Sequence, residues 1–385
     1  MREVHAIIRH WMSESGIESR VDAAGNLIGR LSANAPSISA QLPIRRVLMI
    51  GSHLDTVPNA GAFDGILGVM IGLAVAESFN ERSLPFAIDV VGFSEEEGVR
   101  YAQPYLGSRA IAGTFDSTWL DRVDEAGIPM KTAILEFGLD PEKISAAAIQ
   151  PQTIIGFIET HIEQGPVLER LGKPVGVVTS IVGQSRLVVC FEGEAGHAGT
   201  MPMFPRRDAL VTAARWIQQV KQTGCSIEGL RATVGRVQVS PNASNVIPAY
   251  VELSLDVRHP SDAVRIKAVE DLVDAATGFA IEDDLRFTVL QRSDSPSVAV
   301  SPRLESLLAE CVESKGIEVV RLPSGAGHDA VVMGQCFPMS MLFIRHPKGI
   351  SHHPDEYVDV EDVGVAIEVL IEFVDRLASQ DLTTA

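Results

Sequence analysis

The chain has 385 residues, of which 46% are hydrophobic, and its 50 acidic and 32 basic side chains give a net charge of −18. This length is ample for a sizeable hydrophobic core. Binding to nucleic acid or to an anionic membrane requires basic patches, so the negative net charge argues against both functions. The four cysteines are widely spaced and the charged N-terminus lacks the apolar segment of a signal peptide, so we expect a cytoplasmic protein.

Strand-like and helix-like segments alternate along the first half of the chain. Residues 47–50 are an apolar run that predicts a buried parallel strand, residues 66–79 predict a helix, and residues 86–93 predict the next strand. The apolar part of that helix is too short to span a bilayer. The Ala-, Ser- and Pro-rich residues 32–44 predict a surface loop. This alternation continues to residue 182 and predicts a largely parallel sheet covered on both faces.

A different pattern occupies the middle of the chain and predicts a compact α+β unit. Its strand-like segments lie near residues 187–191, 232–239, 251–257 and 285–290, and its helix-like segments near residues 207–221 and 263–276. Alternation returns from residue 302 and ends in an amphipathic helix over 363–377. We therefore predict an α/β fold with a discontinuous, mostly parallel-sheet catalytic domain, residues 1–182 and 295–385, and an inserted α+β domain, residues 183–294.

The first candidate site residues follow the strand predicted at 47–50. His53 and Asp55 lie where that strand opens into a crevice, and Asp64 precedes the predicted helix. An imidazole that binds a metal needs an acceptor for its other ring nitrogen, and we assign that role to Asp55. Asp64 is a candidate bridge between two cations. The alternative is a strand-end histidine with Asp64 as a helix N-cap.

An acidic cluster follows the second strand, where Ser94-Glu-Glu-Glu-Gly98 comes directly after eight mostly apolar residues. Adjacent carboxylates repel one another, and cations relieve that repulsion. The cluster therefore indicates a dinuclear site in which one carboxylate binds metal and a neighbour moves a proton. The alternative is a solvated acidic turn.

Two further histidines complete the set, His161 and His352, each in or after a strand-like segment. The set then contains three histidines, a bridging aspartate and a glutamate. It would give two metal ions mixed nitrogen and oxygen ligands, which suit Zn or Mn and can also bind Co or Ni. Each histidine alone is equally well explained as a packed core residue.

At this point the chain resembles a known family, the carbamoylase-type amidohydrolases of the M20 metallopeptidase clan, which include allantoate amidohydrolase, N-carbamoyl-L-amino-acid hydrolase and beta-ureidopropionase. The similarity runs from about Trp11 to the C-terminus. The motifs that carry it are Gly51-Ser-His-Leu-Asp-Thr-Val-Pro58, Phe63-Asp-Gly65, Glu96-Glu-Gly98, Glu159-Thr-His-Ile-Glu-Gln-Gly-Pro166, Gly196-His-Ala-Gly199, Ser244-Asn-Val-Ile-Pro248, Asp256-Val-Arg258, Ser324-Gly-Ala-Gly-His-Asp329 and Ser351-His352.

The resemblance implies two divalent metal ions per subunit. One is bound by His53, Asp64 and His161, the other by Asp64, Glu97 and His352, and Glu96 falls at the family's general base. Related dipeptidases, tripeptidases and deacylases carry an acidic residue at the position of His161. That difference favours cleavage of ureido compounds over peptides.

The resemblance also assigns residues to the substrate. His197 reaches the partner subunit's active site and supports the oxyanion, and Arg258 is a candidate for a bidentate contact with a substrate carboxylate. Gln164 and Asn245 match positions for the polar ends of the substrate, and Gly327 and His328 lie in a substrate-facing loop. The inserted domain is implied to form the homodimer and to act as a lid.

The expected reaction is hydrolysis of a ureido carbon–nitrogen bond with release of ammonia. A hydroxide that bridges the two metals attacks the carbamoyl carbon, with Glu96 as general base. The substrate is allantoate, an N-carbamoyl-α-amino acid or an N-carbamoyl-β-amino acid, and these choices stay open. The alternatives are an aminoacylase or dipeptidase with the same metals, and a catalytically silent protein that binds ureido ligands.

Overall fold

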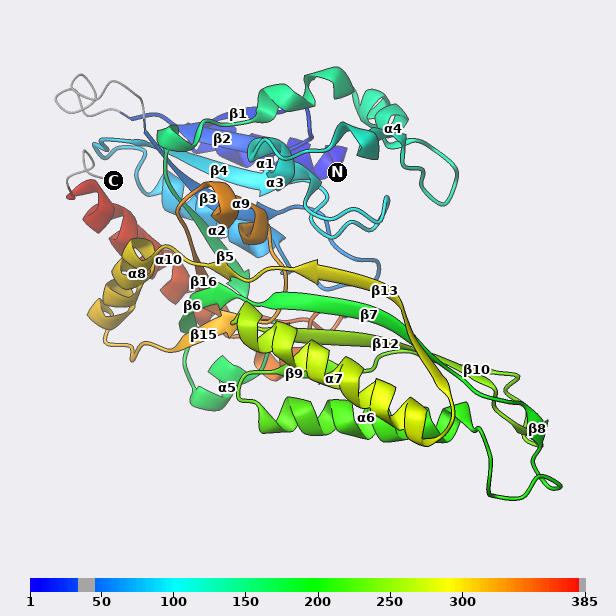
Figure 1. Ribbon diagram of the computed structural model, residues 1–385. Coiled ribbons are helices and arrows are strands. Elements are labelled where there is room, and N and C mark those ends of the chain that lie inside the picture. The colour runs from blue at the N-terminus through cyan, green and yellow to red at the C-terminus, as the bar shows by residue number, and fades with distance from the viewer. Residues whose placement is uncertain (34–45, 381–385) are drawn as a thin grey trace. The chain divides into compact units, whose positions relative to one another are not determined.

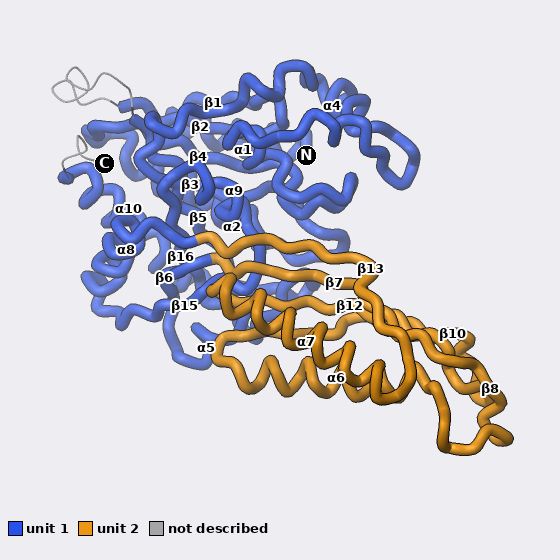
Figure 2. Tube along the Cα trace, in the orientation of Figure 1, with its two compact units in different colours: residues 1–180, 299–385 blue, residues 181–298 orange. Residues whose placement is uncertain are grey.

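The computed structural model of the protein describes residues 1–33 and 46–380, so the surface loop predicted at 32–44 lies almost wholly outside the described residues. The chain forms two compact units. Unit 1 comprises residues 1–180 and 299–385, and unit 2 comprises residues 181–298 (Figure 2). The corresponding sequence prediction has its boundaries at 182–183 and 294–295.

Unit 1 is built on a sheet with the strand order β1-β2-β4-β3-β5-β16-β6-β14, and β15 pairs with β6 (Figure 1). The strands are β1 (Glu18–Val21), β2 (Leu27–Leu31), β3 (Val47–His53), β4 (Ala87–Phe93), β5 (Ile154–Ile162), β6 (Val175–Ile181), β14 (Val298–Ala299), β15 (Arg321–Ser324) and β16 (Met339–Ile344). The central strands β4, β3, β5 and β16 are parallel to one another, whereas β1, β2 and β6 join antiparallel. The predicted α/β class with a largely parallel central sheet is confirmed.

Every residue of β3, β4, β5 and β16 is buried. Strands that are buried along their whole length need helices over both faces, which explains their continuous apolar sequences. The helices of unit 1 are α1 (Arg2–Glu14), α2 (Ile66–Glu77), α3 (Leu106–Ile111), α4 (Met130–Phe137), α5 (Val167–Leu171), α8 (Pro302–Ser314), α9 (Ala330–Cys336) and α10 (Val360–Ala378). Helices α2, α8 and α10 contribute to one large apolar core with the central strands.

Unit 2 has an antiparallel sheet in the order β10-β12-β7-β13, with β9 paired to β12, and a separate small ribbon of β8 and β11. The strands are β7 (Gly183–Glu192), β8 (Gly196–His197), β9 (Arg231–Thr233), β10 (Val237–Ser240), β11 (Val246–Ile247), β12 (Tyr250–His259) and β13 (Arg286–Ser295). Figure 1 shows α6 (Ala209–Ser226) and α7 (Asp262–Glu282) side by side along this sheet. Burial alternates strictly along β12, so one face packs on the helices and the other does not.

No helix within residues 1–33 and 46–380 is both long and apolar enough to cross a membrane.

Candidate metal centre and active site

The topology of unit 1 brings separate stretches of sequence to one edge of the sheet. His53 ends β3, and its register partner Phe93 ends the parallel neighbour β4 just before Glu96 and Glu97. His161 lies near the end of β5, on the other side of β3. Because parallel strands end at the same edge, these side chains converge there. The loop before α2 adds Asp64, and the loop before α10 adds His352.

The Asp64 carboxylate lies between two groups of side chains. Its Oδ1 is 3.0 Å from His161 Nε2 and 3.6 Å from His53 Nε2. Its Oδ2 is 3.1 Å from His352 Nε2, and His352 Nε2 is 3.5 Å from Glu97 Oε1. Two triads of metal-ligating atoms therefore share Asp64, with all atoms of each triad within 4.8 Å of one another. This is the pairing of residues that the sequence predicted for two cations.

The hydrogen bonds of the histidine rings test whether these residues fit a metal ion. His53 Nδ1 lies 2.8 Å from the carbonyl oxygen of Asp55, and His161 Nδ1 lies 2.9 Å from that of Ile162. A carbonyl oxygen only accepts, so each Nδ1 carries a hydrogen, and in its neutral form each ring directs the lone pair of Nε2 inward. These two Nε2 atoms are 3.4 Å apart and face Asp64. When both rings are neutral, these lone pairs repel each other, and a cation between them turns the arrangement into a binding site.

The close packing of histidines and carboxylates in the centre shifts their pKa values. Burial opposes charge on His53, yet Asp64 and neighbouring carboxylates raise its pKa well above the ordinary value, and the pKa of His161 is also raised. Burial raises the pKa of Glu96 well above its usual range. The charge of His53 acts to lower this pKa, whereas the charges of Asp329 and Glu97 raise it further. The pKa of Asp64 is depressed because, despite burial, both histidines stabilise its charge. The metal-free centre therefore holds protons that a metal ion would displace.

Asp55 differs in detail from the sequence prediction. Its backbone carbonyl, rather than its carboxylate, is the close acceptor of the His53 ring, and Asp55 Oδ1 is 3.9 Å from His53 Nδ1. The carboxylate instead accepts the backbone N–H groups of Glu96 at 2.9 Å and Glu97 at 3.1 Å. Asp55 thus joins the end of β3 to the turn that presents the two glutamates.

Glu356 belongs to the centre and was missed by the sequence analysis. Its buried carboxylate accepts the backbone N–H groups of Phe63 and Asp64 at 2.9 and 3.0 Å, and the hydroxyl of Ser351 at 3.0 Å. Glu356 therefore orients Asp64 from behind. A Cβ on Gly61 would lie 2.2 Å from that of Glu356, so glycine at 61 is what allows this approach. A glutamate directly after His353-Pro354-Asp355 carries no sequence signal for that role.

Backbone conformation around the centre is unusual. Glu95, Gln164 and His352 all have positive φ angles, of 54°, 54° and 56°. Residues other than glycine seldom adopt this left-handed region, and such strain concentrates at functional sites. Gln164 Nε2 donates to Asp64 Oδ2 at 3.2 Å and to Ser351 Oγ at 3.0 Å. In the structure, the residue predicted to contact substrate therefore also supports Asp64.

The loop that carries Gly327 and His328 lies against the centre. His328 is buried, its ring centroid is 4.4 Å from that of His161, and its Nε2 is 2.8 Å from Ser324 Oγ. Burial and the charge of His161 lower the pKa of His328 well below its ordinary value, so this ring stays neutral. The contact that the structure assigns to His328 is packing on a predicted metal ligand.

The other predicted substrate residues belong to unit 2. His197 and Asn245 lie on the β8–β11 ribbon or beside it, where the Asn245 carbonyl accepts the N–H of Ala198 at 2.9 Å. His197 is exposed, and its Nδ1 accepts the N–H of Gly199 at 3.1 Å, which leaves Nε2 as the donor of the neutral ring. Arg258 makes a two-point contact with Asp256 at 2.8 and 3.1 Å. The sequence analysis predicted that Arg258 binds a substrate carboxylate, and it did not anticipate that the Asp256 carboxylate occupies the guanidinium.

Comparison with known proteins identifies the family. Residues 49–376 match the peptidase family M20/M25/M40. An N-carbamoyl-L-amino acid amidohydrolase of Geobacillus stearothermophilus is 37% identical, over 98% of this chain and 91% of that protein. The allantoate amidohydrolase of Bacillus subtilis is 34% identical, over 95% and 88%. A crystal structure of a hydantoinase/carbamoylase family amidase from Burkholderia multivorans superposes with a TM-score of 0.89 at 34% identity, over 98% and 90% of the two chains.

The chain belongs to the peptidase family M20/M25/M40 and, within it, to the carbamoylase-type amidohydrolases. The resemblance inferred from the motifs is confirmed. So is the predicted enzyme class, a hydrolase of carbon–nitrogen bonds in linear amides.

Proposed function

We propose that the protein hydrolyses the ureido group of allantoate or of an N-carbamoyl-amino acid and releases ammonia, with two divalent cations held by His53, Asp64, Glu97, His161 and His352. The observation that carries this proposal is the Asp64 carboxylate, whose two oxygens face two separate groups of ligand atoms. Relatives at 34–37% identity are named for N-carbamoyl-L-amino acids and for allantoate, which supports the substrate class. Zn and Mn suit the mixed nitrogen and oxygen ligands, as do Co and Ni.

Bound cations would supply a water of lowered pKa and polarise the ureido carbonyl. Glu96 is buried beside His53 and Glu97, in position to accept the proton of the attacking water. The same carboxyl then gives that proton to the departing nitrogen, the carbon–nitrogen bond breaks, and ammonia leaves. The other product is a carbamate, which loses carbon dioxide to leave an amine. Asp55 and Glu356 hold the backbone on which Glu96, Glu97 and Asp64 depend.

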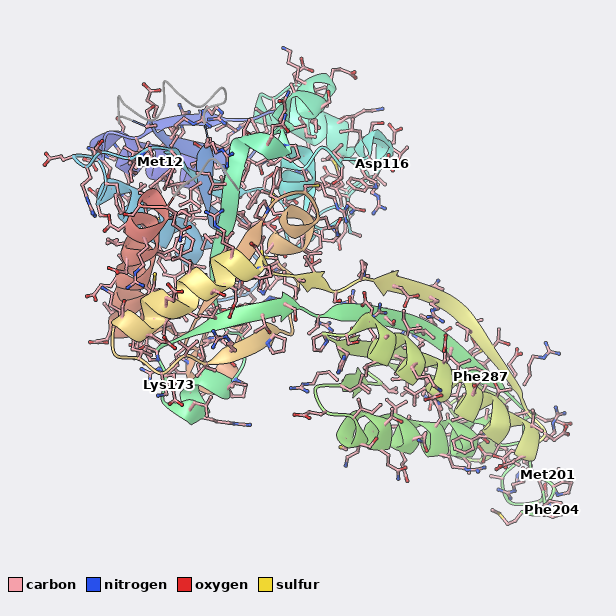
Figure 3. The ribbon with its side chains drawn as sticks, turned by 60° about the vertical axis from the view of Figure 1, so that its left-hand side comes forward. Met12, Asp116, Lys173, Met201, Phe204 and Phe287 are labelled. Atoms are coloured by element: carbon pink, nitrogen blue, oxygen red, sulfur yellow. The ribbon has the colours of Figure 1, made fainter. Side chains whose placement is uncertain are left out.

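We further propose that unit 2 forms the homodimer and supplies His197, Asn245 and Arg258 to the substrate, with His197 acting in the partner subunit's site. Apolar side chains are exposed at its surface, where Met203 is 78% and Phe204 is 89% accessible. Figure 3 shows Met201 and Phe204 at the tip of the loop that follows β8. The edge strand β13 is exposed along most of its length, which supports pairing or packing with a second chain.

The four cysteines are all unpaired in the structure. Their thiol state supports our assignment to a reducing compartment such as the cytoplasm.

The test is ammonia release by metal-replete protein from allantoate, several N-carbamoyl-L-amino acids and N-carbamoyl-β-alanine, with acyl-amino acids and dipeptides assayed for free amine. Release from ureido compounds alone supports the proposal and identifies the substrate. Cleavage of the acyl or peptide compounds alone contradicts it and favours the aminoacylase or dipeptidase alternative. A protein that binds the ureido compounds without cleaving any of them is the silent binding protein.

A further inference from the structure

The loop between β4 and α3 folds back on itself, so that its last residues pair with its first residues, which include the proposed general base Glu96. Its two arms are paired by backbone bonds from Gly107 N to Ser94 O, from Leu106 N to Glu95 O and from Tyr105 N to Glu96 O, at 2.9, 3.2 and 3.0 Å. The backbone of Tyr105 is therefore fixed directly beside that of Glu96, although the two residues are nine positions apart in the sequence. The proposed mechanism gives Tyr105 no part.

Tyr105 holds an uncommon backbone conformation at this position. Its φ and ψ angles of 64° and 28° lie in the left-handed region, at the N-cap of α3. This conformation is unfavourable for a bulky residue, and the surrounding structure must hold it in place. The pairing with Glu96 is one such restraint.

The phenol of Tyr105 extends to the loop that carries Gly327. A Cβ built on Gly327 would lie 2.1 Å from Tyr105 Oη and 3.3 Å from Cζ, so only glycine at 327 leaves room for the hydroxyl. The loop itself is anchored, because Ala330 N donates to the buried carboxylate of Glu159 at 2.9 Å and Ser324 Oγ lies 2.8 Å from His328 Nε2. The backbone of Tyr105 is thus held by Glu96, and its hydroxyl lies against the Gly327 loop.

The hydroxyl is available as a donor. Within residues 1–33 and 46–380, we find no hydrogen-bond partner for Tyr105 Oη, and Tyr105 is half-buried. Burial raises the pKa of this phenol, and the charges of Glu96 and Asp329 raise it further, so the group stays protonated. Negative charge on Glu96 and Asp329 would repel a substrate carboxylate at the Tyr105 hydroxyl. A neutral acceptor on the substrate is therefore the suitable hydrogen-bond partner for this hydroxyl.

We propose that Tyr105 is a further active-site residue, whose hydroxyl donates a hydrogen bond to the carbonyl oxygen of the scissile ureido group beside Glu96. This inference rests on the proposed function for the identity of the acceptor. The contact orients the carbonyl for attack and strengthens as negative charge develops on its oxygen. The bonds that form and break, and the proton transfers by Glu96, stay as in the proposed mechanism.

Tyr105→Phe removes the hydroxyl and keeps the ring. We expect kcat/KM for the best ureido substrate to fall about 10- to 100-fold, with the metal content and the unfolding midpoint unchanged. Tyr101→Phe is the matched control, because Tyr101 lies in the same excursion and its buried hydroxyl also has no partner within the described residues, but it lines a pocket with His5 and Phe137 instead. That variant should keep wild-type kcat/KM. Equal activity of Tyr105→Phe and wild type would overturn the proposal.

A second measurement is independent of turnover. In a Glu96→Gln background, calorimetric titration with allantoate and with N-carbamoyl-L-alanine should show weaker binding when Tyr105 is replaced by Phe, by about tenfold for the compound that the wild type cleaves. Gly327→Ala should likewise reduce kcat/KM, and by less in the Tyr105→Phe background, because the added methyl group no longer meets a hydroxyl. Strictly additive losses would contradict the contact between these residues.

Failure of this inference is distinguishable from failure of the proposed function. If the wild type cleaves only acyl-amino acids or dipeptides, the ureido assignment is wrong, but the scissile amide still offers a carbonyl oxygen. The same variants are then compared on that substrate. A loss confined to Tyr105→Phe supports the donor role there, and no loss overturns it.

Discussion

The two units hold their predicted site residues in different ways. In unit 1, ligand side chains from distant parts of the sequence converge so closely that each triad fits within 4.8 Å, and most of them are buried. In unit 2, His197 and Asn245 are exposed and Arg258 is engaged by Asp256. The first group is brought together by the sheet, and we propose that it binds cations without rearrangement. For the second group, we propose a function that depends on a substrate or on a second subunit, and its roles are therefore tested on the assembled enzyme.

The largest expected effect comes from removing the metal ions. Chelation should abolish activity, and Zn or Mn should restore it. Because the pKa values of His53 and His161 are raised in the metal-free centre, both rings are protonated at low pH and must lose protons to bind a cation. Metal affinity should therefore rise with pH, and calorimetry in buffers of different ionisation enthalpy should detect proton release. Activity that survives complete metal removal would contradict the assignment of the centre.

The next effect separates proton transfer from metal binding. Glu96→Gln keeps the size of the side chain but removes the base, so kcat should fall by about 10²- to 10⁴-fold. The metal content should stay at the wild-type level, because the two proposed metal ions are held by the triads that share Asp64. Glu96 occurs only in a third possible group, with His53 and Glu97. Rates and metal analysis on the same preparation check both parts. Substantial turnover by this variant would remove Glu96 from the role of base.

A third prediction addresses unit 2. His197→Ala should lower kcat by about 10²- to 10³-fold if its Nε2 supports the oxyanion. Mixing His197→Ala with Glu96→Gln subunits should restore about one quarter of the wild-type activity, because each heterodimer then contains one complete site. The double variant mixed with wild type is the control and should give no such gain. Absence of complementation would mean that His197 acts within its own subunit.

The ordered strands explain why so much of unit 1 was predictable from sequence. The apolar runs before His53 and Glu96 placed these residues at strand ends, and parallel strands bring their ends together. What sequence did not reveal depends on tertiary contacts. The Asp55 carboxylate binds backbone amides instead of the His53 ring, Arg258 meets Asp256, and Tyr105 returns to Glu96. Such contacts are set by loop conformation, which has no periodic signal in the sequence.

Glu356 offers the sharpest test of how far the buried centre depends on residues that bind no metal. Its carboxylate accepts the backbone N–H groups of Phe63 and Asp64, so Glu356→Ala leaves those donors without their partner. We expect metal affinity to fall about 10- to 100-fold, as for other groups that orient ligands, with a smaller loss in Glu356→Gln, whose amide oxygen still accepts. Glu361→Ala, an exposed acid in the first turn of α10, is the matched control for charge. Competition with a metal indicator measures all three variants, and equal affinities would show that Asp64 is held in place without Glu356.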